Sequence, residues 1–178
     1  NLAKNFQAAQ TLLHQLKFKQ KPPAEIVDID RFAQYMAIAD LLEAYHGIGW
    51  HNVRFYYNPI TSKLEPIGYD GFGEMPTPYN NGLFVGYKIN FDRNPHEYFK
   101  YLFTDQDFFR KYIAYLDAYS KEEFITKTME SYVPQIAERA AFIQQEFKKY
   151  TYDSLKVMNR GKKLQALIRP YGEFDIKV

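Results

Sequence analysis

The segment RFAQYMAIADLLEAYHGIGWHNVRFYYNPITSKLEPIGYDGFG, residues 31–73, joins a helical pattern to a strand-turn-strand pattern. Its first part carries apolar side chains at helical spacing. Its second part holds two runs of strand-forming residues, 53–57 and 63–67, on either side of a turn-rich linker. The segment therefore predicts a central helix that ends at His46-Gly47, followed by a β-hairpin.

The predicted central helix is apolar around much of its circumference, which is typical of a buried helix. Asp28 or Asp30 can cap its start. Leu42 falls on the apolar pattern and is expected in the core, where a Leu42→Ala change would cost about 2 to 5 kcal/mol. The apolar positions of this helix are Phe32, Tyr35, Met36, Ile38, Ala39, Leu42 and Tyr45.

Upstream of this segment, a first amphipathic helix is predicted over residues 6–18, before the Lys21-Pro22-Pro23 breaker. Residues 70–94 are rich in Gly, Pro and Asn and predict a long irregular excursion. Residues 174–178 alternate like a short strand or an extended tail.

The part of the chain after the excursion is predicted to be helical. Helix starts are predicted at Thr104 and Ser120, because each is followed three residues later by an acidic residue, as in a capping box. Pro134 should kink the second of these helices or restart it near Tyr132. A last helix is predicted to begin at Asp153.

These patterns predict the α+β class, mainly helical, with a small hairpin at residues 53–69. A chain of 178 residues can hide roughly 70% of its unfolded surface, so residues 1–178 are expected to form one domain. The chain begins at Asn1 without Met or a signal segment, and we expect it to be a C-terminal piece of a larger protein.

The composition limits the possible partners. The net charge is +2, from 23 basic and 21 acidic side chains, and such a balance does not predict nucleic acid as a partner. The absence of Cys excludes disulfides and a thiolate nucleophile, and fits a reducing compartment or a secreted bacterial protein. Aromatic residues reach 18%, which predicts half-buried tyrosines in a helical core, with sugar binding or an extracytoplasmic surface as alternatives. An extracytoplasmic or cell-surface location is slightly favoured. No apolar run is long enough for a membrane span.

The two ends of the hairpin carry the residues that can form a polar site. Asn52 precedes the first strand and Asp70 follows the second, so a hairpin should bring them to the same end of the sheet. An amide oxygen and a carboxylate are ligands that suit Mg²⁺, which takes one or two protein oxygens together with water and phosphate. The sequence therefore predicts a magnesium site at Asn52 and Asp70.

The order of helix, polar loop ending in Asn, hairpin and Asp-Gly-Phe-Gly is that of protein-kinase-like phosphotransferases. In detail, the chain resembles the CotH family of atypical (spore-coat-type) protein kinases. Its later helices, from Phe103 onward, resemble the helical remainder of that family's C-terminal lobe. The resemblance is carried by Phe32-x-x-Tyr35, Asp40-Leu41-Leu42, Trp50-His51-Asn52-x-Arg54-x-Tyr56-x-Asn58-Pro59, Lys63-Leu64-Glu65-Pro66-Ile67 and Asp70.

The resemblance implies a kinase-C-lobe-like fold and phosphoryl transfer to protein Ser or Thr. Asn52 and Asp70 match the family's metal-binding positions, and Gly71 follows as part of the cofactor-binding segment. The family's catalytic Asp before the Asn is missing, so its role as base falls to His46 or His51 or is vacant. Mg²⁺ with ATP is the implied cofactor, although a C-terminal lobe alone should bind ATP poorly.

Other interpretations of the same residues remain open. The chain can be a catalytically inactive, kinase-like binding or scaffold module, which the missing Asp favours. Asp70 can simply form a turn with Gly71. A zinc site from His46, His51 and Asp70 is a weaker alternative. Arg54 is expected to pair with Glu65 across the hairpin.

Overall fold

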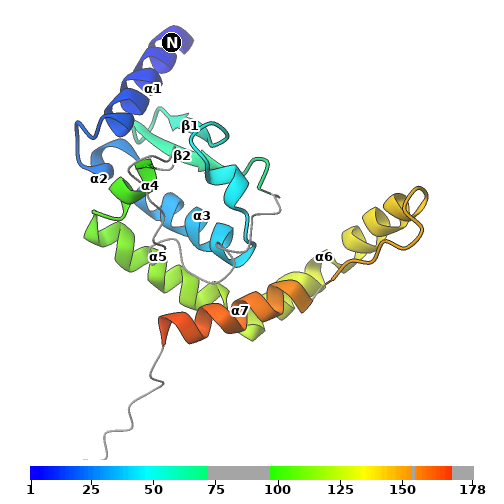
Figure 1. The fold of residues 1–178 in the computed structure, drawn as a ribbon. Coiled ribbons are helices and arrows are strands. Elements are labelled where there is room, and N and C mark those ends of the chain that lie inside the picture. Colours follow the sequence, from blue (N-terminus) through cyan, green and yellow to red (C-terminus); the bar gives the residue numbers. More distant parts are fainter. Residues whose placement is uncertain (72–96, 154, 170–178) are drawn as a thin grey trace, which may run out of the picture. The chain divides into compact units, whose positions relative to one another are not determined.

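The computed structural model describes residues 1–71, 97–153 and 155–169 (Figure 1). The chain is mainly helical with a two-stranded antiparallel hairpin, which confirms the predicted class. It forms two compact units, Asn1–Leu116 and Asp117–Val178. The elements are α1 (Leu2–Lys17), α2 (Pro23–Ile26), α3 (Ile29–Leu41), the 3₁₀ turn η1 (Tyr45–Ile48), β1 (Arg54–Asn58), β2 (Lys63–Ile67), α4 (Glu97–Leu102), α5 (Gln106–Tyr119), α6 (Glu122–Gln144) and α7 (Leu155–Ile168).

Parts of the predicted organisation lie outside the described residues. The excursion over residues 70–94 falls almost wholly there, and so does the segment 174–178. Among the helices that the structure does describe, none combines the length and the apolar character needed to cross a membrane.

Helix α3 is the centre of the first unit and lies between the hairpin and α5 (Figure 1). The ring of Phe32 packs 5.9 Å from that of Phe55 on β1. The backbone amide of Asp28 donates to the carbonyl of Leu64 on β2, at 2.8 Å, which ties the start of α3 to the hairpin. The fully buried side chains of this unit include Leu16, Ile26, Phe32, Met36, Leu64, Leu102, Phe108 and Tyr112.

Both ends of α3 are set by local hydrogen bonds. The predicted cap at Asp28 is confirmed, since its Oδ1 accepts from the Arg31 amide at 3.0 Å. At the other end Glu43 takes a left-handed φ of 54°. The amide of Ala44 then donates to the Ala39 carbonyl at 2.8 Å, and that of Glu43 to the Asp40 carbonyl at 3.3 Å, which is a Schellman motif.

This motif corrects two predictions about α3. The helix ends at Leu41 rather than at His46-Gly47, because the reversal at Glu43 stops it. Leu42 is the C-cap residue and is 52% exposed, so its expected place in the core is wrong. Leu41 is the buried neighbour instead.

The hairpin itself matches the prediction. Strands β1 and β2 pair in antiparallel register, with Tyr56 opposite Glu65. In the turn, the side-chain oxygen of Asn58 accepts from the amide of Ile60 at 2.9 Å, and Ser62 has a left-handed φ of 55°. Asn58 therefore closes the turn with its own side chain.

The helix starts after residue 97 differ from the predicted capping boxes. Asp105, not Thr104, caps α5, and its Oδ1 accepts from the amides of Asp107 and Phe108, each at 3.0 Å. The Thr104 hydroxyl is used elsewhere, because it donates to the carbonyl of Tyr101 at 2.7 Å. The sequence spacing alone did not distinguish these two roles.

A polar cluster joins α3 to α5. Asp30 Oδ1 accepts from the Tyr115 hydroxyl at 2.8 Å and lies 3.1 Å from Lys111 Nζ. Asp30 Oδ2 accepts from Gln34 Nε2 at 2.8 Å. The hydrogen bond from Tyr115, followed by the contact with Lys111, lowers the pKa of Asp30 below its usual value, against the opposing effect of burial.

Replacing Asp30 by Asn should therefore destabilise the first unit at neutral pH and have less effect in acid. A lowered folded-state pKa contributes stability that is present above the unfolded pKa, about 4, and is lost as pH falls through the folded value. Because Asp30 is partly exposed, we expect the free energy of unfolding of Asp30→Asn to be lower than that of the unmodified protein by at most about 1 kcal/mol at pH 6. The measurement is urea unfolding at pH 6 and pH 3, followed by fluorescence of the chain's single Trp, Trp50.

The control for this prediction is Glu138→Gln, which removes a charge from the exposed face of α6 in the other unit. Asp30→Asn and the unmodified protein should differ less in free energy of unfolding at pH 3 than at pH 6. An equal difference at both pH values would contradict the assignment of this stability to the ionised carboxylate.

The second unit is an α6–α7 helical hairpin. Helix α6 runs without interruption through Pro134, so the predicted restart near Tyr132 does not occur. Ser120 does not cap α6, because it is buried and its hydroxyl accepts from Gln165 Nε2 at 2.8 Å. The last helix starts next to Asp153, as predicted: α7 begins at Leu155, whose amide donates to Asp153 Oδ1 at 3.0 Å.

Candidate functional site

The structure brings three of the predicted site residues together where η1 meets the ends of the hairpin. Asn52 Nδ2 lies 3.1 Å from Asp70 Oδ2. His46 Nδ1 lies 3.1 Å from the same carboxylate oxygen. The Asn52 side chain is buried, whereas those of His46 and Asp70 are 44% and 47% exposed. The site is therefore open to solvent on one side and anchored by Asn52 on the other.

One form of the imidazole satisfies all the contacts in this cluster. Asn52 Nδ2 has two protons, which it donates to Asp70 Oδ2 and to the backbone carbonyl of His46, at 3.1 and 3.2 Å. His46 Nδ1 lies 3.2 Å from this amide, so in the arrangement that satisfies every group it carries a proton and donates it to Asp70. The lone pair of a neutral His46 is then on Nε2.

Gly47 allows the two parts of the site to approach. A Cβ at position 47 would lie 2.5 Å from the carbonyl oxygen of Tyr69 and 3.0 Å from Cα of Gly71. Both are backbone atoms, which cannot rotate away as a flexible side chain can. Only glycine therefore fits where η1 crosses the segment that carries Asp70.

The backbone of Asp70 is itself unusual, with a φ of 43° in the left-handed region. Asp and Asn tolerate this region better than most residues do. The conformation reverses the chain at the end of β2, toward η1. Sequence reasoning missed both Gly47 and this reversal, although the glycine directly after His46 was a visible signal.

Arg54 contacts both ends of the hairpin, and the predicted pair of Arg54 with Glu65 is wrong. Its guanidinium carbon lies 4.7 Å from the centre of the Tyr69 ring, and its Nη1 donates to the carbonyl of Asn52 at 2.8 Å. Glu65 instead accepts from Asn58 Nδ2 at 2.7 Å. Arg54 therefore contacts the neighbour of Asp70 and the backbone of Asn52.

Two tyrosine hydroxyls, from α3 and α4, donate to the backbone of η1. Tyr98 donates to the carbonyl of Ile48 at 2.7 Å, and Tyr35 to that of Gly47 at 3.2 Å. Burial raises the pKa of Tyr98 well above its usual value, so its phenol stays a neutral donor. Trp50 packs edge-on against the Tyr98 ring, 5.3 Å away, and fills the junction beside η1.

The remaining predicted residues lie beside the cluster. His51 is exposed, and its ring lies edge-on to that of His46 with centroids 6.0 Å apart. Gly71 contacts the helix end, since a Cβ there would lie 3.2 Å from Ala44 Cβ. Within residues 1–71, 97–153 and 155–169 no group of three or more His, Cys, Asp or Glu can hold a metal, so His46, His51 and Asp70 do not form a zinc site.

One donor of the site, a carboxylate oxygen of Asp70, suits Mg²⁺ in its present position. Asp70 Oδ2 accepts two N–H groups, while Oδ1 accepts no hydrogen bond from the described residues. Mg²⁺ often uses one carboxylate oxygen and completes its shell with water and phosphate. Asn52 presents its amide nitrogen to Asp70, so its oxygen becomes a second ligand only after rotation of the amide.

The chain matches no protein-family model, no curated protein and no solved structure. The resemblance to CotH-like kinases therefore stays a prediction.

Proposed function

We propose that this chain is the metal-holding lobe of a phosphotransferase of the CotH-like atypical kinase type, acting on Ser or Thr of proteins. The observation that carries the proposal is the contact of Asn52 with Asp70 at 3.1 Å, with His46 on the same carboxylate. The two residues that the resemblance assigns to the metal are thus neighbours. His46, one of the two histidines that could replace the missing Asp, lies beside them.

In this proposal Asp70 supplies the negative charge of the site. Its Oδ1 faces no protein donor among the described residues, so it is the atom that would bind Mg²⁺. Bound Mg²⁺ would neutralise phosphate charge as the phosphoryl group is transferred. Asn52, buried and bonded to the His46 carbonyl, keeps the carboxylate in place.

His46 is the proposed base. Its Nδ1 proton is held by Asp70, so Nε2 is the atom that accepts the proton of the substrate hydroxyl. Asp70 then lies beside the imidazolium that forms and stabilises it. His51, whose ring lies 6.0 Å from that of His46, is the second histidine of the site and is exposed.

A second candidate is a catalytically inactive, kinase-like binding or scaffold module. It is favoured by the direction of the Asn52 amide, whose nitrogen rather than oxygen faces Asp70. The carboxylate, imidazole and amide then satisfy one another without a cation. The two candidates differ in whether Asp70 binds Mg²⁺.

The test is thermal unfolding with and without Mg²⁺, and with Mg²⁺ and ATP. Mg²⁺ at about ten times its dissociation constant should stabilise the fold by about 1.4 kcal/mol, which raises Tm by a few degrees. Asp70→Asn keeps the size of the side chain but removes its charge, and we expect it to abolish this rise. Glu25→Gln, an exposed carboxylate of the same unit, should leave it unchanged.

Two results would contradict the proposal. If the unmodified protein shows no rise with Mg²⁺ or with Mg²⁺ and ATP, Asp70 is not a metal ligand. If Asp70→Asn keeps the full rise, the cation binds elsewhere. An unchanged Tm under both conditions would support the scaffold function, because Asp70 then binds no Mg²⁺.

A further inference from the structure

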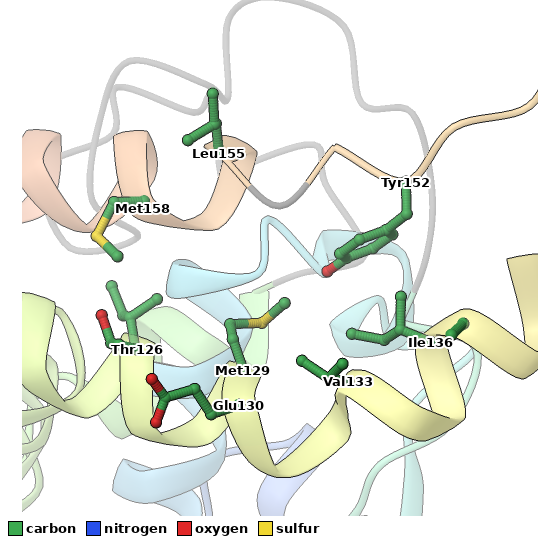
Figure 2. A pocket seen from close by; sticks show the side chains of 10 residues that line it. Thr126, Met129, Glu130, Val133, Ile136, Tyr152, Leu155 and Met158 are labelled. Carbon is green, nitrogen blue, oxygen red and sulfur yellow. The ribbon is translucent and has the colours of Figure 1, made fainter.

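A groove of about 450 Å³ lies between α6 and α7 in the second unit (Figure 2). From α6, Met129, Val133 and Ile136 point toward α7, and Met158 points toward them from α7. Leu155, at the start of α7, also lines the groove. All of these side chains are apolar. Since the groove belongs wholly to the second unit, it is separate from the candidate site at Asp70.

The described residues of the second unit, 117–153 and 155–169, do not close this groove. At the base of the helical hairpin Ile125 and Leu164 are buried, and Gly161 packs against the Ser120 carbonyl. Toward the other end, Val133 and Leu155 are 58% and 65% exposed. Two packed helices form one layer, and an apolar face of one layer needs a second layer to cover it.

The two helices that form the groove carry opposite charge. Helix α6 has four Glu against Lys127 and Arg139, whereas α7 has three Lys and no acidic residue; its Arg160 is buried and is not part of this surface. Glu130 lines the groove from α6. Lys162 follows Met158 by four residues and so lies on the same face of α7.

We propose that the groove is covered by the same groove of a second copy of this chain. In a two-fold dimer with its axis along the helices, α6 of one copy lies on α7 of its partner, and the reverse. Apolar surfaces then meet, and the acidic helix of each copy faces the basic helix of the other. The opposite arrangement, α6 on α6, would bring like charges together.

The first test is sedimentation of the full chain over a range of concentrations. The protein should dimerise, and Val133→Glu should raise the dimer dissociation constant by about tenfold or more, because it places a charge in the apolar contact. Val133 is exposed in one copy, so this variant should keep its circular dichroism. The matched control is Tyr132→Glu, which is 54% exposed on the same helix but does not line the groove.

The second test uses the charge pattern. Glu130→Lys leaves α6 without net charge and puts a basic residue on both groove faces, whereas Lys162→Glu puts an acidic residue on both groove faces. Each variant alone should dimerise more weakly than the unmodified protein. Mixing the two should restore a one-to-one dimer, because the altered charges then match across both contacts.

A chain that is monomeric at every concentration would overturn the proposal and leave another protein or an apolar ligand as the occupant. The proposal would also be overturned if Tyr132→Glu weakened the dimer as much as Val133→Glu does. It would be overturned as well if the mixture of Glu130→Lys and Lys162→Glu dimerised no more tightly than each variant alone. These outcomes are independent of Mg²⁺ binding at Asp70, since the proposal does not rest on the proposed function.

Discussion

Phe32→Ala should lower the free energy of unfolding of the first unit by about 3–5 kcal/mol. The Phe32 ring is fully buried in α3 and packs against Phe55 of the hairpin. Its removal leaves a cavity between helix and sheet that the surrounding backbone cannot fill. Trp50 fluorescence during urea unfolding measures this, because the chain's single Trp belongs to the same unit.

The control for this change is Leu42→Ala, ten residues further along the same segment. Leu42 is 52% exposed, and its truncation should change the unfolding free energy by no more than about 0.5 kcal/mol. A large loss at Leu42, or an unchanged midpoint for Phe32→Ala, would show that the face of α3 that packs on the hairpin is assigned wrongly.

Gly47→Ala should both destabilise the first unit and abolish the rise of Tm with Mg²⁺. The added methyl would lie 2.5 Å from the Tyr69 carbonyl, so η1 and the segment carrying Asp70 must separate. Forcing backbone apart in this way costs about 1–3 kcal/mol. Thermal unfolding with and without Mg²⁺ measures both effects in one experiment.

Gly68→Ala is the matched control, because a Cβ at position 68 meets nothing within 4 Å. It should be neutral or slightly stabilising, by at most about 1 kcal/mol, and should keep the response to Mg²⁺. If Gly47→Ala behaves like Gly68→Ala, the close approach of the two segments does not control the geometry at Asp70.

The hairpin and the start of α3 were predictable because their signals are local. Asp28 caps the helix with its own side chain, and Asn58 closes the turn with its own side chain. The end of α3 was not predictable from periodicity. The apolar pattern continues through Leu42, but the helix is ended by the left-handed backbone conformation of Glu43, which the residue types do not reveal.

The capping errors have a similar physical cause. Thr104 and Ser120 both have the spacing of a capping box, yet each hydroxyl bonds to another partner. The Ser120 hydroxyl accepts a hydrogen bond from Gln165, forty-five residues later in the chain. Only the packing of α7 against α6 brings Gln165 near Ser120. Asp105, one residue from the predicted cap, could have been chosen equally well from its type.

For the site, the meeting of Asn52 and Asp70 follows from hairpin geometry and was predicted. Their roles in metal binding stay predictions. What the sequence did not reveal was the direction of the contacts: the nitrogen of Asn52 toward the carboxylate, and Arg54 on Tyr69 rather than on Glu65. Rotamers and ring contacts of this kind depend on neighbours that no spacing rule includes.

The three residues of the candidate site, His46, Asn52 and Asp70, lie on one continuous stretch of chain. Contacts of such short range form early and rapidly when a protein folds, because little chain entropy is lost in closing the loop. The candidate site can therefore assemble with the hairpin, before the long-range contact of Tyr98 with Ile48 is made. During biosynthesis it would be complete soon after Asp70 leaves the ribosome, ahead of every helix that follows.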